Sequence, residues 1–318
     1  MESRQIIGGP AAITYNGVTY YTEGDITLTP VTESRVIESS WHGPVSTRHT
    51  DRAMELSFTP LGVLPSGGTL AAYIPYGPGD LGKMVAPGTD KDAVVTTAGG
   101  VTITLKAAVI SSVPDIHFGT DSGPFGQMTI TGMGGTLANK ASGAASSIFA
   151  TSTGTLSAAL DASRILTPGY QLTLSPSSGD DVVIDGESGF DLTLGMTLNP
   201  IRVNAYGTVN FQLASVAPEL TFSPIGPTEA EALAWLLLQG SSAGPLGSPA
   251  TLGLSGVLAP IGGQAGIKFT FPDCQITRGS MAFGSQSHRH GDYVLKPCVT
   301  SSVQTPYALT LYEPSQGA

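Results

Sequence analysis

Glu-Leu-Ser-Phe-Thr-Pro-Leu-Gly, residues 55–62, occurs a second time, slightly changed, as Glu-Leu-Thr-Phe-Ser-Pro-Ile-Gly, residues 219–226. Five of the eight positions are identical, and the other three exchange Ser with Thr or Leu with Ile. The copies begin at Glu55 and Glu219 and are therefore 164 residues apart. We expect a structural role for this motif, with aromatic residues in a core, prolines that end a strand and a closing glycine: Phe58, Pro60, Gly62, Phe222, Pro224 and Gly226.

Further matches follow in the same order along the chain at nearly the same offset. They pair Asp25-Ile26-Thr27-Leu28 with Asp191-Leu192-Thr193-Leu194, Gly43-Pro44-Val45 with Gly207-Thr208-Val209, Leu81-Gly82 with Leu246-Gly247, 118–122 with 283–287, and 126–130 with 291–295. A repeat of about 165 residues has the size of a domain rather than of a solenoid unit. The sequence therefore predicts a tandem duplication: a first domain over 1–137, a Gly/Ala/Ser/Thr-rich linker over 138–164, and a second domain over 165–318.

Composition limits the function. Charged residues make up 12% of the chain, against about 25% in a typical soluble domain. Two explanations fit this low charged fraction. Much of the surface contacts other protein, or the hydroxyls of Thr and Ser solvate the surface of a β protein. The net charge of −10 argues against sequence-specific nucleic-acid binding. The N-terminal residues lack the pattern of a signal peptide, and the longest apolar run, 232–238, is too short to span a bilayer. We therefore expect a soluble protein made in the cytoplasm.

The pattern of the chain predicts a mainly β fold. Asn16-Gly17 between two short apolar runs favours a type I′ hairpin turn. A longer hairpin follows in each half, with arms over 33–58 and 198–222. In the second, Ile201, Val203 and Ala205 alternate with polar residues, as strands with one covered face do. A short helix is expected after each motif, over 69–73 in the first half and over 229–239 in the second, where Thr228 and Glu231 form a capping box.

The two long hairpins differ in charge, which indicates that the first faces a distinct partner surface. A solvated hairpin explains either composition, because exposed ion pairs contribute little individually. The candidate contacts between subunits or rings are Glu33, Arg35, Glu38, Trp41, His42, Arg48, Asp51 and Arg52 in the first hairpin, and Arg202 and Tyr206 in the second.

Other constellations give little support for an active site. His288, His290 and Asp292 could form a metal site, but they also fit a polar hairpin tip, and spacing suggests no further ligand. Gly77-Pro78-Gly79-Asp80-Leu81-Gly82 lacks the strand and helix that a dinucleotide site needs. Cys274 and Cys298 are compatible with a disulfide, but a reducing cytosol favours free thiols. No nucleophile elbow or zinc-protease motif occurs. We therefore expect no enzyme activity, no cofactor and no metal.

These motifs together resemble the tail tube proteins of long-tailed bacteriophages. The resemblance lies in Gly8-Gly9-Pro10 with 13–17, in the run 39–45 (Ser-Ser-Trp-His-Gly-Pro-Val), and in the motif 55–62. It is strongest over 6–130 and extends to the second half through the repeat. It implies two tandem β-sandwich or barrel-like tail-tube domains, each with a long hairpin and one short flanking α-helix.

The resemblance also implies a function. A tail tube protein is a structural virion protein that forms stacked rings around a lumen, through which DNA passes on ejection. Its partners are further copies of itself and the tape-measure, tail-tip and tail-terminator proteins, and it is assembled in the bacterial cytoplasm. Most members contribute one domain per chain and six chains per ring, so two domains per chain imply a trimeric, pseudo-hexameric ring. The alternatives are a baseplate or distal-tail ring subunit, a two-domain β-sandwich binding or surface module, and a hydrolase built on His288, His290 and Asp292.

Overall fold

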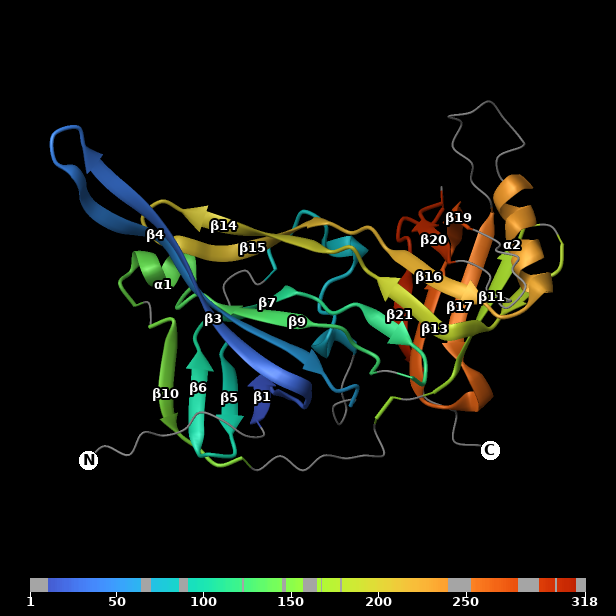
Figure 1. The fold of residues 1–318 in the computed structure, drawn as a ribbon, viewed down its shortest axis with the longest axis horizontal. Helices are drawn as coiled ribbons and strands as arrows, with labels where there is room; N and C mark the ends of the chain where they lie inside the picture. The colour runs from blue at the N-terminus through green and yellow to red at the C-terminus, as the bar shows by residue number, and fades with distance from the viewer. Residues whose placement is uncertain are drawn as a thin grey trace.

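The protein is mainly β, as the sequence predicts. The computed structural model describes residues 11–63, 70–85, 91–121, 123–144, 147–156, 165–166, 168–177, 179–239, 253–279, 292–300 and 302–312. Antiparallel strands dominate these residues, which contain two α-helices, α1 (Leu137–Ala141) and α2 (Pro227–Gln239) (Figure 1). Neither helix combines the length and apolar character that a membrane crossing demands.

Two sheets form in the first half of the chain. One has the strand order β10-β6-β5-β1-β2, with bounds Phe149–Thr153, Val101–Leu105, Ala93–Thr97, Ala11–Tyr15 and Val18–Tyr20. The other has the order β3-β4-β9-β7, with bounds Thr22–Ser39, Gly43–Pro60, Met128–Gly132 and Ala108–Ser112. The turn between β1 and β2 has positive φ at both Asn16 (51°) and Gly17 (79°), which confirms the predicted hairpin.

The second half repeats both strand orders. Its first sheet reads β21-β18-β17-β11-β12, with bounds Ala308–Tyr312, Gly266–Phe271, Leu254–Pro260, Tyr170–Pro176 and Val182–Ile184. Its second reads β13-β16-β20-β19, with bounds Gly186–Thr193, Glu219–Pro224, Tyr293–Cys298 and Asp273–Arg278. Each strand takes the place that its counterpart takes in the first half, so the two halves have the same topology.

One strand crosses from the first half to the second. β8 (Ile116–Phe118) follows β7 in the chain but pairs antiparallel with β13, so that it extends the second sheet of the second half. Phe118, His117 and Ile116 lie opposite Phe190, Asp191 and Leu192, respectively. Within the described residues, β3, which corresponds to β13, has no strand on its outer edge.

The pairing register corrects the sequence alignment of these two edge strands. Leu28 lies opposite Leu56, and Leu192 lies opposite Leu220. Leu56 and Leu220 are equivalent in the repeated motif, so Leu28 corresponds to Leu192 at an offset of 164. The expected offset of 166 is therefore wrong by two residues. A shift of two leaves every side chain on the same face of the sheet, so apolar alternation could not detect it.

The segment predicted to be a linker, 138–164, contains ordered structure of the first half. Thr136 caps α1, its Oγ1 accepting from the Asn139 N–H at 3.4 Å. β10 pairs with β6, with Phe149 opposite Leu105. β10 therefore belongs to a sheet of the first half. Its composition suits a strand, but composition does not say which sheet the strand joins.

The helices after the repeated motifs differ from expectation. In the described residues 70–85 of the first half, the predicted helix is a single 3₁₀ turn, η1 (Leu70–Ala72). In the second half α2 begins at Pro227, one residue before the predicted N-cap Thr228. The Gly226 N–H donates to Glu229 Oε2 (3.2 Å), so Glu229 rather than Glu231 closes the N-terminus. Proline is favoured at the first helical position because its φ suits a helix. The side chains of residues 235–238, in the apolar run of the predicted helix, lie outside the described residues.

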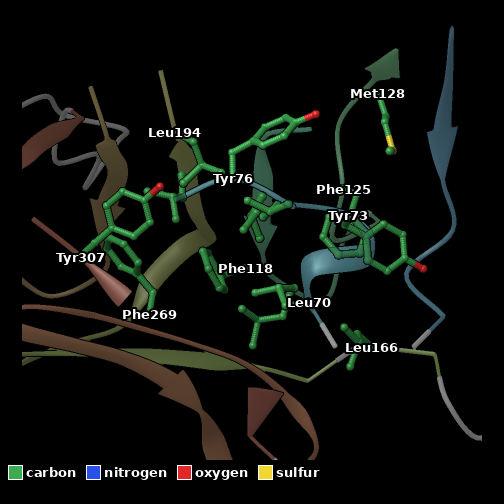
Figure 2. Packing of buried hydrophobic residues seen from close by; sticks show 14 of the residues in the cluster. Leu70, Tyr73, Tyr76, Phe118, Phe125, Met128, Leu166, Leu194, Phe269 and Tyr307 are labelled. Carbon is green, nitrogen blue, oxygen red and sulfur yellow. The ribbon is translucent and has the colours of Figure 1, made fainter. Parts of the chain in front are cut away.

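One continuous core joins the two halves. Phe58 and Phe222 are buried, and β4 and β16 end at Pro60 and Pro224. A Cβ at Gly62 would overlap the ring of Pro124, whereas a Cβ at Gly226 would approach the Glu229 carboxylate at 3.2 Å. Phe118 packs edge-on against Tyr170 of the second half, with ring centroids 5.0 Å apart. Figure 2 shows this region, where aromatic and aliphatic side chains from both halves meet. The halves are therefore packed together as well as connected by the chain.

Candidate interaction surface

The hairpin β3–β4 extends beyond the rest of the molecule and is exposed on both faces. We call residues 32–50 of this hairpin the first arm (Figure 1). Trp41 at its tip is 86% exposed, and Val36, Ile37 and Val45 are exposed as well. A two-stranded ribbon without cover is marginally stable in water, and exposed tryptophan is uncommon outside binding surfaces. The first arm is therefore the strongest candidate for an interaction surface.

The equivalent hairpin of the second half is covered by the same chain. We call β14 (Thr197–Val203) and β15 (Gly207–Ser215) the second arm. Six of the nine residues of β15 are buried, whereas among the equivalent residues 43–51 of β4 only Asp51 is buried. Phe211 packs against Val109 and Met133 of the first half. The two arms have the same length but opposite exposure, because the second arm lies on the first half.

Backbone hydrogen bonds fix the second arm in this position. The Gly82 N–H donates to the Leu213 carbonyl (2.8 Å), and the Val85 N–H donates to the Phe211 carbonyl (2.9 Å). The Leu213 N–H donates in return to the Lys83 carbonyl (3.2 Å). Residues 82–85 thus continue the ladder of β15. The contact between the halves is therefore made by main-chain pairing as well as by side-chain packing.

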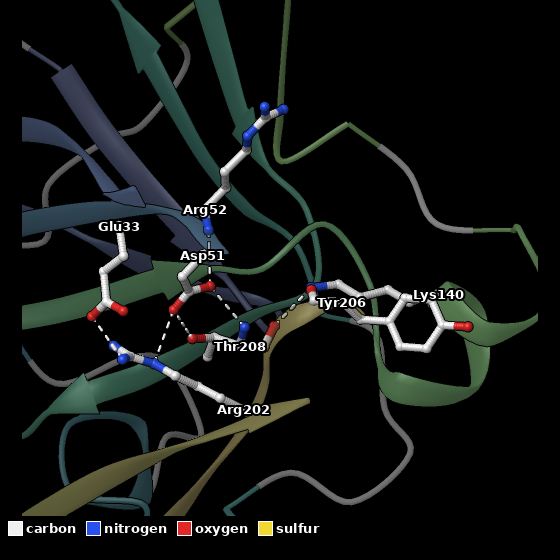
Figure 3. Close-up of polar contacts among 7 residues, drawn as sticks. All are labelled: Glu33, Asp51, Arg52, Lys140, Arg202, Tyr206 and Thr208. Atoms are coloured by element: carbon white, nitrogen blue, oxygen red, sulfur yellow. Dashed lines mark hydrogen bonds and ion pairs between the residues drawn. The ribbon is translucent and has the colours of Figure 1, made fainter. Parts of the chain in front are cut away.

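Asp51 joins the base of the first arm to the tip of the second arm. It is 4% exposed and accepts hydrogen bonds from the Thr208 N–H (2.7 Å), the Thr208 hydroxyl (2.6 Å) and the Arg52 N–H (2.8 Å). Arg202 binds it through Nε (3.0 Å) and binds Glu33 through Nη1 (2.6 Å) (Figure 3). Burial acts to raise the pKa of Asp51, but the hydrogen bonds and the Arg202 charge outweigh it and lower that pKa.

Lys140 and Gly207 complete this junction. Lys140 Nζ donates to the carbonyls of Tyr206 (3.1 Å) and Thr208 (2.7 Å) (Figure 3). Burial lowers the pKa of Lys140, although the charge of Asp51 acts to raise it. Gly207 has a φ of 70°, and a Cβ there would come within 2.5 Å of Asp51 Oδ1. Glycine is thus needed at the tip of the second arm for its backbone to approach Asp51 this closely.

The structure divides the predicted contact residues into two groups. Glu33, Asp51, Arg202 and Tyr206 lie together in the junction and bind within the chain. The remaining predicted residues are exposed along the first arm or at its base: Arg35, Glu38, Trp41, His42, Arg48 and Arg52. Sequence reasoning missed Thr208 and Lys140. Lys140 is one of only two basic residues of the predicted linker, the other being Arg164, which could have drawn attention to it.

Two arginines lie directly opposite each other on the first arm. Arg35 of β3 pairs with Arg48 of β4. Like charges in directly opposite positions destabilise a strand pair. The arm nevertheless keeps both in a chain whose net charge is −10. This arrangement suits an acidic surface that would neutralise the two guanidinium groups.

A second titratable cluster lies where β8 joins β13. His117 contacts Asp191 Oδ1 through Nδ1 (2.7 Å) and Asp121 Oδ1 through Nε2 (2.8 Å). Burial acts to lower the pKa of His117, but hydrogen bonds to Asp191 and Asp121 and the charges of both raise it overall. The pKa of the neighbouring Asp115 is raised by burial and by the charge of Asp191. The β8–β13 contact therefore includes an Asp–His–Asp bridge, which could not be predicted from the sequence pattern.

The proposed metal ligands His288 and His290 lie outside the described residues. Asp292 accepts from the Ser223 hydroxyl (2.7 Å) and lies 3.6 Å from Arg278. No group of three or more His, Cys, Asp or Glu in the described ranges is placed to hold a metal ion.

Cys274 and Cys298 are free thiols, as expected. Cys274 lies opposite Pro297, and Cys298 lies opposite Asp273. The two cysteines are thus one position out of register and point to opposite faces of the sheet. Burial, more than any other cause, raises the pKa of the Cys274 thiol well above its usual range.

No family model matches the chain, and no curated protein sequence matches it.

Proposed function

We propose that this chain is the structural subunit of a bacteriophage tail tube, which polymerises into stacked rings around a conduit for DNA. The single observation that carries the proposal is the contrast between the two arms. The second arm is buried on a neighbouring unit of the same topology, and the first arm has the same length and no cover. A surface of this kind is expected in a protein whose neighbours in the assembly are further copies of itself. The resemblance of the motifs 13–17, 39–45 and 55–62 to tail tube proteins supports the tube in particular.

The repeated topology supports a ring of three chains. Each chain supplies two units with the same strand order, so three chains provide six quasi-equivalent positions. We propose that the duplication arose by fusion of two such units. The low charged fraction, 12%, agrees with a chain most of whose surface is buried in an assembly.

The net charge supports a conduit rather than a nucleic-acid-binding protein. DNA is held by neutralising its phosphates with Lys and Arg, and this chain has 14 Lys and Arg against 24 Asp and Glu. An acidic wall repels phosphates, so DNA would pass along it without being retained. In this proposal the tape-measure protein occupies the lumen before ejection, and the tail-tip and terminator proteins bind the two ends of the tube.

Electron microscopy of the purified protein tests the proposal. We expect negatively stained samples at rising concentration to contain rings and then tubes with a central channel. A variant in which Asn-Gly replaces the tip residues 40–42 shortens only the exposed arm. We expect this variant to assemble less than the native chain. Monomers at every concentration would contradict the proposal, and single rings that never stack would favour a baseplate or distal-tail ring.

A further inference from the structure

The two arms share their strand register, including the positions of its irregularities. In the second arm the pairing shifts after Thr197 and after Ile201. In the first arm it shifts after Glu33 and after Ile37, each 164 residues earlier in the chain. Such shifts bend a ribbon and increase its local twist. The first arm therefore has the shape with which the second arm fits the neighbouring half.

The face under the second arm has a counterpart in the second half. Ile110 of β7 lies opposite Ile130 of β9. Ile276 of β19 lies opposite Leu295 of β20 in the same way. The two opposite residues are equivalent at the offset of 165, so β7 and β19 take the same register in their sheets. This register gives the counterparts of the residues that contact the second arm: Gln275 for Val109, and Cys298 for Met133.

The counterpart is open, whereas the face under the second arm is covered. Val109 and Met133 are 1% and 4% exposed and pack against Phe211. Gln275 and Cys298 are only half-buried, and within the described part of the chain neither arm covers them. We call the outward face of β19 and β20 around these two residues the second-half face.

We infer that the first arm of one chain lies over the second-half face of a second copy, in the geometry that the second arm adopts on the first half. Thr47, which corresponds to Phe211 at the offset of 164, then contacts Gln275 and Cys298. The inference deepens the proposed function, on which it rests for the presence of an assembly of identical chains. Because the contact is head-to-tail and repeats with one rotation, it closes into a ring when that rotation divides the circle.

The side chains of the two contacts differ in a way that suits this assignment. Within the chain, the large apolar Phe211 packs on Val and Met, and folding buries all three. Between chains, the counterparts are Thr47, Gln275 and Cys298, which are smaller or more polar. Surfaces that stay exposed to water until assembly cannot carry a large apolar patch without causing aggregation. The shape of the contact is thus kept, and its polarity is adjusted to a single chain in solution.

The tip of the first arm also finds an apolar partner in this geometry. In the first half, Lys140 in the connection after β9 binds the tip of the second arm, where Ala205 borders a hollow of about 350 Å³. The corresponding connection after β20 exposes Val299 (48%) and Val303 (40%). Trp41 takes the position of Ala205 at the offset of 164 and can fill a hollow of this size. Docking therefore brings the exposed Trp41 against exposed valines.

The native thiol of Cys298 provides a probe of this contact. Thr47→Cys places a second thiol beside it across the proposed interface, and the other native thiol, Cys274, is buried. Arg48→Cys is the matched comparison, because adjacent residues of a strand point to opposite faces. We expect mild oxidation of Thr47→Cys to give covalent dimers and larger species that a reductant reverses. Their yield should be about tenfold above that of Arg48→Cys, whose thiol cannot meet the geometry of a disulfide with Cys298.

Two controls make the outcome specific. Thr47→Cys combined with Cys298→Ser should lose the covalent product. Phe211→Cys with Met133→Cys, also in the Cys298→Ser background, probes the equivalent contact inside the chain and should cross-link without changing the oligomer size. A yield from Thr47→Cys no higher than from Arg48→Cys would overturn the inference, as would a product that persists without Cys298.

A charge placed at the tip contact gives a test without cysteines. Val299→Asp should raise the concentration at which rings form by about tenfold or more, since docking would bury an unpaired carboxylate. Val183→Asp adds the same charge at an exposed valine of β12, outside the second-half face, and should assemble like the native chain. Both residues are exposed, so both variants should keep the native melting temperature. Equal assembly of the two variants would contradict the contact.

These outcomes separate the inference from the proposed function. If tubes form but Thr47→Cys does not cross-link to Cys298, the inference fails and the tube proposal stands. If the cross-link forms but no ring or tube is seen, arm docking stands and the tube proposal fails. Covalent products that end at three chains support the ring of three, whereas longer products support arm docking and contradict that ring size.

Discussion

At the scale of single residues, Asp51 is the most consequential polar group, because it is buried and four donors converge on it. Thr208→Val removes the hydroxyl donor at nearly constant volume, and Asp51→Asn removes the charge. We expect Thr208→Val to lower the free energy of unfolding by about 1 kcal/mol and Asp51→Asn by about 1–3 kcal/mol. Urea unfolding at neutral pH measures both changes. An equal effect from Asp25→Asn, at an exposed position, would contradict a special role for Asp51.

The lowered pKa of Asp51 also predicts a pH dependence. A carboxyl group with a lowered pKa in the folded protein stabilises the fold above its unfolded pKa, about 3.9. That stability is lost as the pH falls through the folded value. We therefore expect the difference in unfolding free energy between the native chain and Asp51→Asn to shrink between pH 5 and pH 2, in the range where carboxyl groups titrate. A difference that stays constant over this range would contradict the argument.

His117 should give a pH dependence of the opposite sign. Its pKa is raised by the flanking Asp191 and Asp121, so its contribution is complete below the unfolded pKa of about 6.5. The contribution is lost as the pH rises through the folded value, and the raised pKa of Asp115 acts in the same direction. We expect the melting temperature of the native chain to fall more between pH 6 and pH 9 than that of His117→Gln. His49→Gln, on the exposed arm, serves as the control and should behave like the native chain.

At the scale of secondary-structure elements, the exposed first arm predicts an optical signal. Trp41 is largely in contact with solvent in the single chain. In a Trp235→Phe background its emission should shift to shorter wavelength as the protein assembles, since assembly would bury the tip. Trp41→Ala should weaken assembly without changing the melting temperature, because Trp41 contributes little to the core. Emission that does not shift while particles form would exclude the tip from the interface.

The directly opposed Arg35 and Arg48 predict that one substitution raises the stability of the arm and weakens assembly. Arg35→Glu replaces a like-charge pair by an opposite-charge pair and should stabilise the arm by about 0.2–1 kcal/mol. If the arginines face an acidic surface of a neighbouring copy, the same variant should assemble less and its assembly should depend less on salt. Light scattering over a salt series measures this. Arg52→Glu, at the base of the arm, provides a charge-matched comparison.

The elements show what the sequence could predict. The turn at Asn16-Gly17 could be predicted because its left-handed backbone dihedrals depend on the two turn residues themselves. The repeat in the sequence was visible because residues 55–62 and 219–226 are nearly identical. The partners of β8 and β10 could not be predicted, since strand pairing depends on contacts distant in the sequence. The contact between Asp51 and Thr208 could not be predicted for the same reason, since these residues are 157 positions apart in the sequence.

At the scale of the whole molecule, the shared core predicts cooperative unfolding. Phe118 and Tyr170 belong to different halves and pack together, and β8 supplies one edge of the second half's sheet. We therefore expect a single calorimetric transition whose van 't Hoff and calorimetric enthalpies agree. Two resolved transitions would show that the halves unfold separately. Phe118→Ala, which removes a fully buried ring, should lower the free energy of unfolding by about 3–5 kcal/mol without splitting the transition.

The covalent joint between the halves has a consequence for assembly. Within each chain the β8–β13 contact forms without an encounter between molecules, because the same chain carries both strands. In the proposed ring of three chains, six units are joined through only three contacts between chains. By mass action, the concentration of complete rings should then rise with the third power of the free chain concentration, whereas six separate units would give a sixth power.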